Sequence, residues 1–119
     1  MSRDHFLYLE DIEACCKKVI RYTDGFSYDE FALDEKTIDA VIRNLEIIGE
    51  AVKQLPTELR EQNPEISWRE IAGMRNFIAH AYFALDLEVV WNVVEAEIPV
   101  LKNAIRDILN AAKPQNKRE

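Results

Sequence analysis

Four side chains of chemical interest stand close together in the segment GMRNFIAHAYF, residues 73–83, namely Arg75, Asn76, His80 and Tyr82. A histidine with an ordinary pKa of about 6.5 can accept or release a proton near neutral pH. A guanidinium can hold two oxygens of one anion and stabilise negative charge that grows during a reaction. The segment could therefore carry a proton-transfer site. A histidine that packs inertly and only satisfies a hydrogen bond is the other interpretation of His80.

The positions of these side chains around the predicted helix decide which of them can contact the same bound group. At about 100° per residue, a polar line forms along one face of the predicted helix. Its members are Arg69, Gly73, Asn76 and His80. A glycine within a helix costs roughly 1 kcal/mol relative to alanine but lets another backbone or a ligand come close. Arg75 lies roughly 140° around the helix from His80. Two copies of the helix across a two-fold axis could aim both residues at one group, because each side of a symmetric contact presents both.

Four segments with apolar residues at helical spacing must position this site. We expect helices at residues 5–22, at 35–55 after an Asp34 cap, from about Ser67, and from about Asp86 to 112. Ser67 and Glu70 match a capping box, and residues 57–62 are expected to form one or two turns. Pro99 should kink the last helix. The pattern predicts an all-α antiparallel bundle of four main helices, as a single domain over residues 1–112 with a polar tail over 113–119.

Composition narrows the classes of function that fit this chain. The 119 residues carry a net charge of −7, so any contact with nucleic acid should be small and local. No apolar run approaches the roughly 18 residues that a membrane span needs, and the charged N-terminus does not resemble a signal peptide. Cys15 and Cys16 are adjacent and should not pair with each other. These features predict a cytoplasmic protein with reduced thiols and no membrane contact.

Several segments, in this order, resemble the HepT-like branch of the HEPN superfamily, a group of toxin ribonucleases. RNFIAHAY fits the motif R-x4-H-x-Y. The surrounding resemblance covers nearly the whole chain, through YLEDI, TIDAVIRNLEIIGEAVKQL, PEISWREIAGMRN, YFALDLEVVW and IPVLKNAI with its internal proline. Ala81 departs from the glycine or polar residue that is often seen there, a change that should leave the chemistry intact.

The resemblance implies a homodimer with a composite site at its interface and cleavage of RNA, not DNA, without a metal or other cofactor. The family's catalytic residues fall on Arg75 and His80, and its supporting polar residue falls on Asn76. Its tyrosine falls on Tyr82, which in this branch receives a nucleotide from a partner antitoxin, a minimal nucleotidyltransferase.

The resemblance also concerns the second predicted helix, where Arg43 or Glu50 is expected to support the cleft. An exposed ladder of charges along that helix is the other interpretation of these residues.

The implied chemistry agrees with the residue types. RNA carries its own nucleophile, the 2′-hydroxyl, beside the scissile phosphate, so a histidine and an arginine suffice. His5 and His80 have no neighbours at zinc-ligand spacing. The sequence therefore predicts an endoribonuclease toxin of a type VII-like toxin–antitoxin pair, silenced by nucleotidylylation (AMPylation) of Tyr82. A non-catalytic helical partner that presents substrate to a minimal nucleotidyltransferase, or an inactive dimeric scaffold, are the alternatives.

Overall fold

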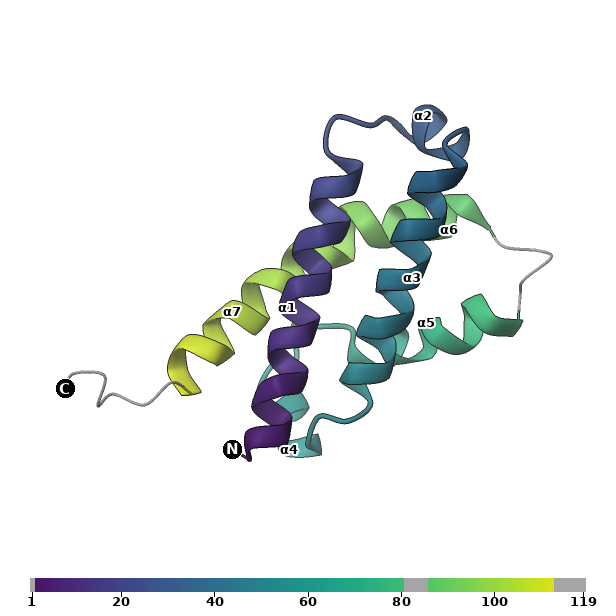
Figure 1. The fold of residues 1–119 in the computed structure, drawn as a ribbon. Helices are drawn as coiled ribbons and strands as arrows, with labels where there is room; N and C mark the ends of the chain where they lie inside the picture. The colour runs from purple at the N-terminus through teal and green to yellow at the C-terminus, as the bar shows by residue number, and fades with distance from the viewer. Residues whose placement is uncertain (1, 81–85, 113–119) are drawn as a thin grey trace.

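The computed structural model describes the backbone of residues 2–80 and 86–112 and the side chains of residues 2–74 and 86–112. Within these ranges every regular element is helical, which confirms the predicted all-α class (Figure 1). The elements are α1 Arg3–Thr23, α2 Tyr28–Ala32, α3 Glu35–Val52, α4 Thr57–Glu61, α5 Trp68–His80, α6 Leu87–Asn92, the π-helical segment η2 Val93–Glu97 and α7 Ile98–Ala112. None of the described helices is both long and apolar enough to cross a membrane.

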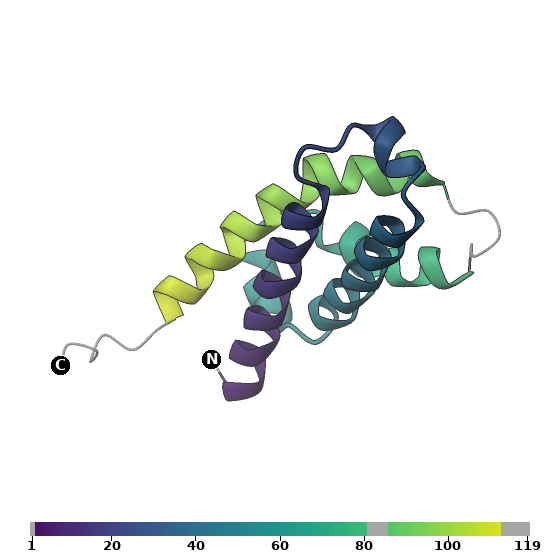
Figure 2. The same cartoon turned by 45° about the horizontal axis from the view of Figure 1, so that its top comes forward.

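The core lies between α1, α3, α5 and the continuous stretch from α6 to α7. Helix α1 packs against both α3 and α7, and α3 packs against α5 on its other side, as Figures 1 and 2 show. Side chains at helical spacing on these elements are fully buried, among them Leu9, Ile12, Val41, Leu45, Ile48, Leu101 and Ile105. Removing this apolar surface from water is the main force that assembles the bundle.

Two predicted helix caps are confirmed. The Asp34 carboxylate accepts a hydrogen bond from the Thr37 backbone N–H at 3.1 Å and starts α3. The Asp86 carboxylate accepts from the backbone N–H groups of Glu88 at 2.9 Å and Val89 at 3.4 Å and starts α6. Each carboxylate satisfies N–H groups that the first helical turn leaves without partners, so these two residues fix where their helices begin.

The predicted capping box at the start of α5 is wrong. Within the described residues, the Ser67 backbone carbonyl accepts a hydrogen bond from the Ile71 N–H at 3.0 Å. The Ser67 hydroxyl makes no hydrogen bond to Glu70 there. A capping box occurs instead at Ser27 and Glu30, where it starts the short helix α2.

Pro99 bends the last helix through a π-helical turn. A proline has no N–H to donate, and its ring would clash with the carbonyl four residues earlier. Just before it, the backbone N–H of Ile98 donates to the carbonyl of Val93, five residues back, which widens the helix over η2. The chain changes direction between α6 and α7 at this point, so the predicted kink takes this form (Figures 1 and 2).

Both cysteines are buried in the core and carry free thiols. Burial raises the pKa of Cys16 to about 12, and burial also raises the pKa of Cys15. Both thiols are therefore neutral at physiological pH and behave as small apolar side chains, in agreement with the prediction that they do not pair.

Candidate active site

Helix α5 places the backbones of Arg75, Asn76 and His80 in its C-terminal half. Regular helical geometry sets Arg75 and His80 about 140° apart around the axis and about 7.5 Å apart along it. Figures 1 and 2 show this end of α5 reaching outward past α3. Tyr82 and the tail at 113–119 lie outside the described residues. The helix thus brings three of the four predicted site residues to one projecting end of the molecule.

The opposite end of α5 is firmly held. The Trp68 indole N–H donates to the Asn63 carbonyl at 2.9 Å, and the indole ring is buried. One turn later Ile71 is buried in the core, and Met74 packs against that core from its edge. These contacts fix the direction of the helix, so its projecting half is positioned by a rigid base.

Gly73 opens a space beside α5. It is exposed, and a Cβ atom built on it would meet no other atom within 4 Å. Packing within the described chain therefore does not require a glycine here, although glycine costs about 1 kcal/mol relative to alanine inside a helix. Gly73 lies on the same helical line as Asn76 and His80 and at the edge of an acidic groove, and the unfilled space leaves room for another molecule to approach.

A groove with an acidic rim runs along one flank of α5. It encloses about 590 Å³ between α5 and the start of the last helix. Its apolar floor includes Ile71, Met74, Val89 and Val93, and its four carboxylates belong to Glu70, Asp86, Glu88 and Glu97. Because four negative charges would repel phosphate groups, this flank is unsuited to RNA.

The supporting residues predicted on α3 lie at its surface. Arg43 is exposed, and its charge acts on the thiol of Cys15, which places it beside α1. Glu50 is also exposed, near the end of α3. Arg43 and Glu50 stay predicted supporting residues, and the charge-ladder interpretation stays open.

No group of three or more histidine, cysteine, aspartate or glutamate side chains in the described ranges is arranged to hold a metal ion.

Comparison with known proteins gives the family. Residues 12–108 match the family model described as Ribonuclease HepT-like. The chain belongs to the HepT-like ribonuclease family. A protein of Thermococcus cleftensis named "Probable ribonuclease HepT" is 46% identical over 102 residues, which are 86% of this chain and 93% of that protein. One of Caldanaerobacter subterraneus subsp. tengcongensis named "Putative RNase" is 42% identical over 106 residues, 89% of this chain and 95% of that protein. No solved structure matches the chain.

A cavity in this HepT-like chain could not be predicted from the spacing of residues along the sequence. Arg60 on α4 and Arg69 on α5 line the same cavity, together with Trp68. The two arginines are nine residues apart in sequence, on different helices, and the turn between them brings them together. The only sequence signal was the Asn63–Pro64 pair, which marks a turn but not what the turn joins.

Proposed function

We propose that this HepT-like protein is a metal-independent endoribonuclease that acts as a homodimer. Each composite site takes Arg75 from one protomer and His80 from the other. The observation that carries this proposal is the register of α5, which separates the two residues by about 140° on one helix. The projecting position of their helix and the open space at Gly73 support a symmetric contact there.

The reaction uses the nucleophile that RNA supplies. His80 takes the proton of a 2′-hydroxyl, and the oxygen attacks the adjacent phosphorus. The bond from phosphorus to the 5′-oxygen breaks as protonated His80 gives that proton to the leaving oxygen. The products are a 2′,3′-cyclic phosphate and a 5′-hydroxyl. The Arg75 guanidinium holds the phosphate oxygens as their charge grows, and Asn76 supports the bound phosphate.

In the cell the protein is a toxin of a type VII-like toxin–antitoxin pair. A minimal nucleotidyltransferase silences it by transferring a nucleotide to the hydroxyl of Tyr82, two residues after His80. The attached phosphate is a bulky anion that occupies the positive charge of Arg75 and blocks the approach of RNA. The resemblance of the motif R-x4-H-x-Y to the HepT-like branch supports this assignment.

The catalytic assignment is tested with purified wild type, Arg75→Ala and His80→Ala on RNA. The cleavage rate of both variants should fall by at least about 100-fold. This is the smallest loss usually seen when an acid–base group or a group that stabilises developing charge is removed. Matched controls are His5→Ala, which removes the other histidine, and Arg21→Ala, which removes an exposed arginine of α1. Retained cleavage in either site variant would refute the assignment. A wild type that cleaves no RNA would favour a non-catalytic partner of a nucleotidyltransferase.

The silencing step is tested by co-expression with the cognate nucleotidyltransferase and intact-mass measurement. Wild type should gain the mass of a nucleotide and lose cleavage, whereas Tyr82→Phe should stay unmodified and active. Tyr8→Phe, on α1, is the matched control and should be silenced like wild type. Nucleotide mass on another residue, or silencing of Tyr82→Phe by modification, would show that Tyr82 is not the switch.

A further inference from the structure

A second charged cavity lies at the fixed end of α5. It is an open depression of about 450 Å³ between α4 and the first turns of α5. Its lining residues are Thr57, Arg60, Glu61, Trp68, Arg69 and Ala72. The hydrogen bond from the Trp68 indole N–H to the Asn63 carbonyl holds the corner where the two helices meet.

The two arginines of this cavity have no acidic partner in the described part of the chain. Neither Arg60 nor Arg69 forms an ion pair there, and the Arg60 Nε is buried with no hydrogen-bond acceptor. Glu61 is the one carboxylate among the residues that line the cavity. The cavity therefore carries a local excess of positive charge in a chain whose net charge is −7. Guanidinium groups that line a cavity can bind an anion with several oxygens.

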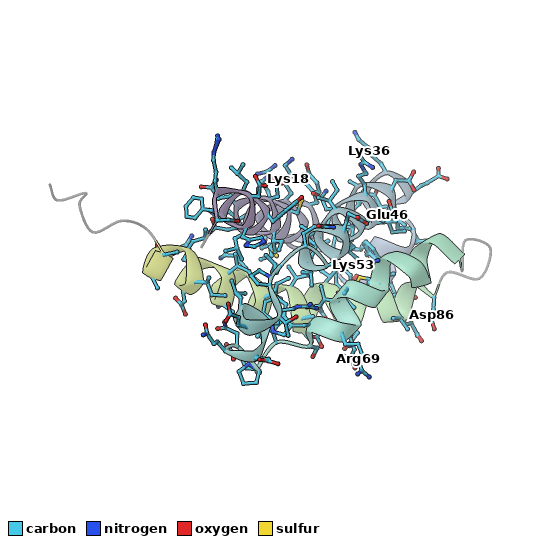
Figure 3. All side chains as sticks on the ribbon, turned by 90° about the horizontal axis from the view of Figure 1, so that it is seen from below. Lys18, Lys36, Glu46, Lys53, Arg69 and Asp86 are labelled. Carbon is cyan, nitrogen blue, oxygen red and sulfur yellow. The ribbon has the colours of Figure 1, made fainter. Side chains whose placement is uncertain are left out.

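The cavity is aligned with the candidate active site. Arg69 starts the helical line that continues through Gly73 and Asn76 to His80. Eleven residues at the helical rise place Arg69 about 16 Å from His80 along the axis. Figure 3 shows Arg69 pointing away from the body of the molecule, on the edge opposite Lys36.

We propose that Arg60 and Arg69 form a phosphate-binding subsite that holds the RNA strand several nucleotides away from the cleaved bond. This inference rests on the proposed ribonuclease function and adds a binding site to it. A span of about 16 Å covers about five stacked nucleotides at about 3.4 Å each, and fewer in an extended strand. The acidic groove beside α5 repels phosphate. The RNA is therefore held by a small, local contact at Arg60 and Arg69.

Binding is tested with a fluorescently labelled single-stranded RNA of about 12 nucleotides and protein carrying His80→Ala, which keeps the RNA intact. Each phosphate contact on a single strand adds about 0.7 to the slope of log affinity against log salt, or about fourfold in affinity at about 0.15 M salt. Arg60→Ala and Arg69→Ala should each show that loss, and the double variant a loss of about 15-fold. Arg69→Lys should keep the slope, because it keeps the charge.

The matched control is Lys36→Ala, which removes one exposed positive charge on the edge opposite Arg69 (Figure 3). It should leave affinity and salt slope unchanged. Equal losses in Lys36→Ala and Arg69→Ala would overturn the subsite in favour of a net-charge effect. Unchanged affinity and slope in both arginine variants would also overturn it.

Cleavage assays on long and short RNA distinguish the phosphate-binding subsite from the ribonuclease activity on which the proposal rests. In protein with His80 intact, Arg69→Ala should raise KM for the long RNA about fourfold and leave cleavage of a dinucleotide unchanged, because a dinucleotide does not reach the subsite. Cleavage of long RNA with a KM unaffected by Arg69→Ala and Arg60→Ala would refute the subsite but not the ribonuclease. RNA binding that depends on both arginines in a wild type that cleaves nothing would support the subsite and refute the ribonuclease.

Discussion

Mixing two inactive variants tests whether the active site is built from two protomers. Arg75→Ala and His80→Ala each leave one residue of the pair intact. If each site joins Arg75 of one protomer to His80 of the other, a heterodimer of the two variants keeps one site with both residues. Its other site lacks both. A site built within one protomer would lack one residue in every copy and could not recover.

The expected recovery follows from symmetry. Random reassociation of equal amounts of the two variants gives about half heterodimers, and each heterodimer has one intact site of two. Activity should therefore return to about a quarter of the wild-type value. The geometric reason is the separation of Arg75 and His80 on α5, about 140° around the helix and about 7.5 Å along it.

The assay measures RNA cleavage after the two purified variants are mixed, partly denatured to exchange protomers, and refolded. Each variant treated alone is the control for contaminating nuclease and for refolding. Recovery of about a quarter supports the composite site. A mixture as inactive as its components, in which mass spectrometry detects heterodimers, would refute it.

Four further predictions concern the metal, the core, the thiols and Gly73. Chelators should leave cleavage unchanged, and a requirement for added magnesium would contradict the proposed chemistry. Phe31→Ala should lower the free energy of unfolding in urea by about 3–5 kcal/mol, because its ring is buried 4.9 Å from that of Trp91, whereas exposed Leu33→Ala should change little. The Cys16 thiol, whose pKa is about 12 instead of the ordinary 9.0, should resist alkylation at neutral pH until the protein unfolds. Its contribution to the free energy of unfolding should fall as pH rises from 9.0 to about 12, because the thiol ionises first in the unfolded chain. Gly73→Ala should stabilise the isolated protomer by up to about 1 kcal/mol in urea unfolding but weaken dimerisation measured by sedimentation, and an unchanged dimer would show that no partner comes close at Gly73.

The long helices could be predicted because their apolar stripes span several turns. The stripe from Ile38 to Val52 predicted α3, and the two aspartate caps marked helix starts within a residue. The five-residue helix α2 is too short to show a period, so its capping box at Ser27 was missed. The same motif at Ser67 was wrong, because that hydroxyl makes no bond to the residue three positions on. A capping box depends on the rotamer and local backbone as well as on residue type.

The candidate site was predictable only as a register on one helix. Spacing and family resemblance placed Arg75 and His80 on α5, and the backbone confirms that helix. Spacing could not reveal the cavity at Arg60, because that residue lies on another helix and reaches α5 only through a tertiary turn. Nor could it reveal the acidic groove, whose carboxylates come from α5 and from the start of the last helix.

The charge distribution around α5 reconciles an acidic protein with an RNA substrate. Arg60 and Arg69 line the cavity at the base of α5, whereas none of the four carboxylates of the acidic groove lines that cavity. Gly73, the next residue on the line from Arg69, also lines that groove, so the Arg69 end of the line is the part that lies away from the carboxylates. Local sign, rather than the net charge of −7, then decides where a strand can bind. One helix can thus hold a phosphate at its base beside Arg69, while the acidic groove farther along it stays suited to a partner that is not a nucleic acid.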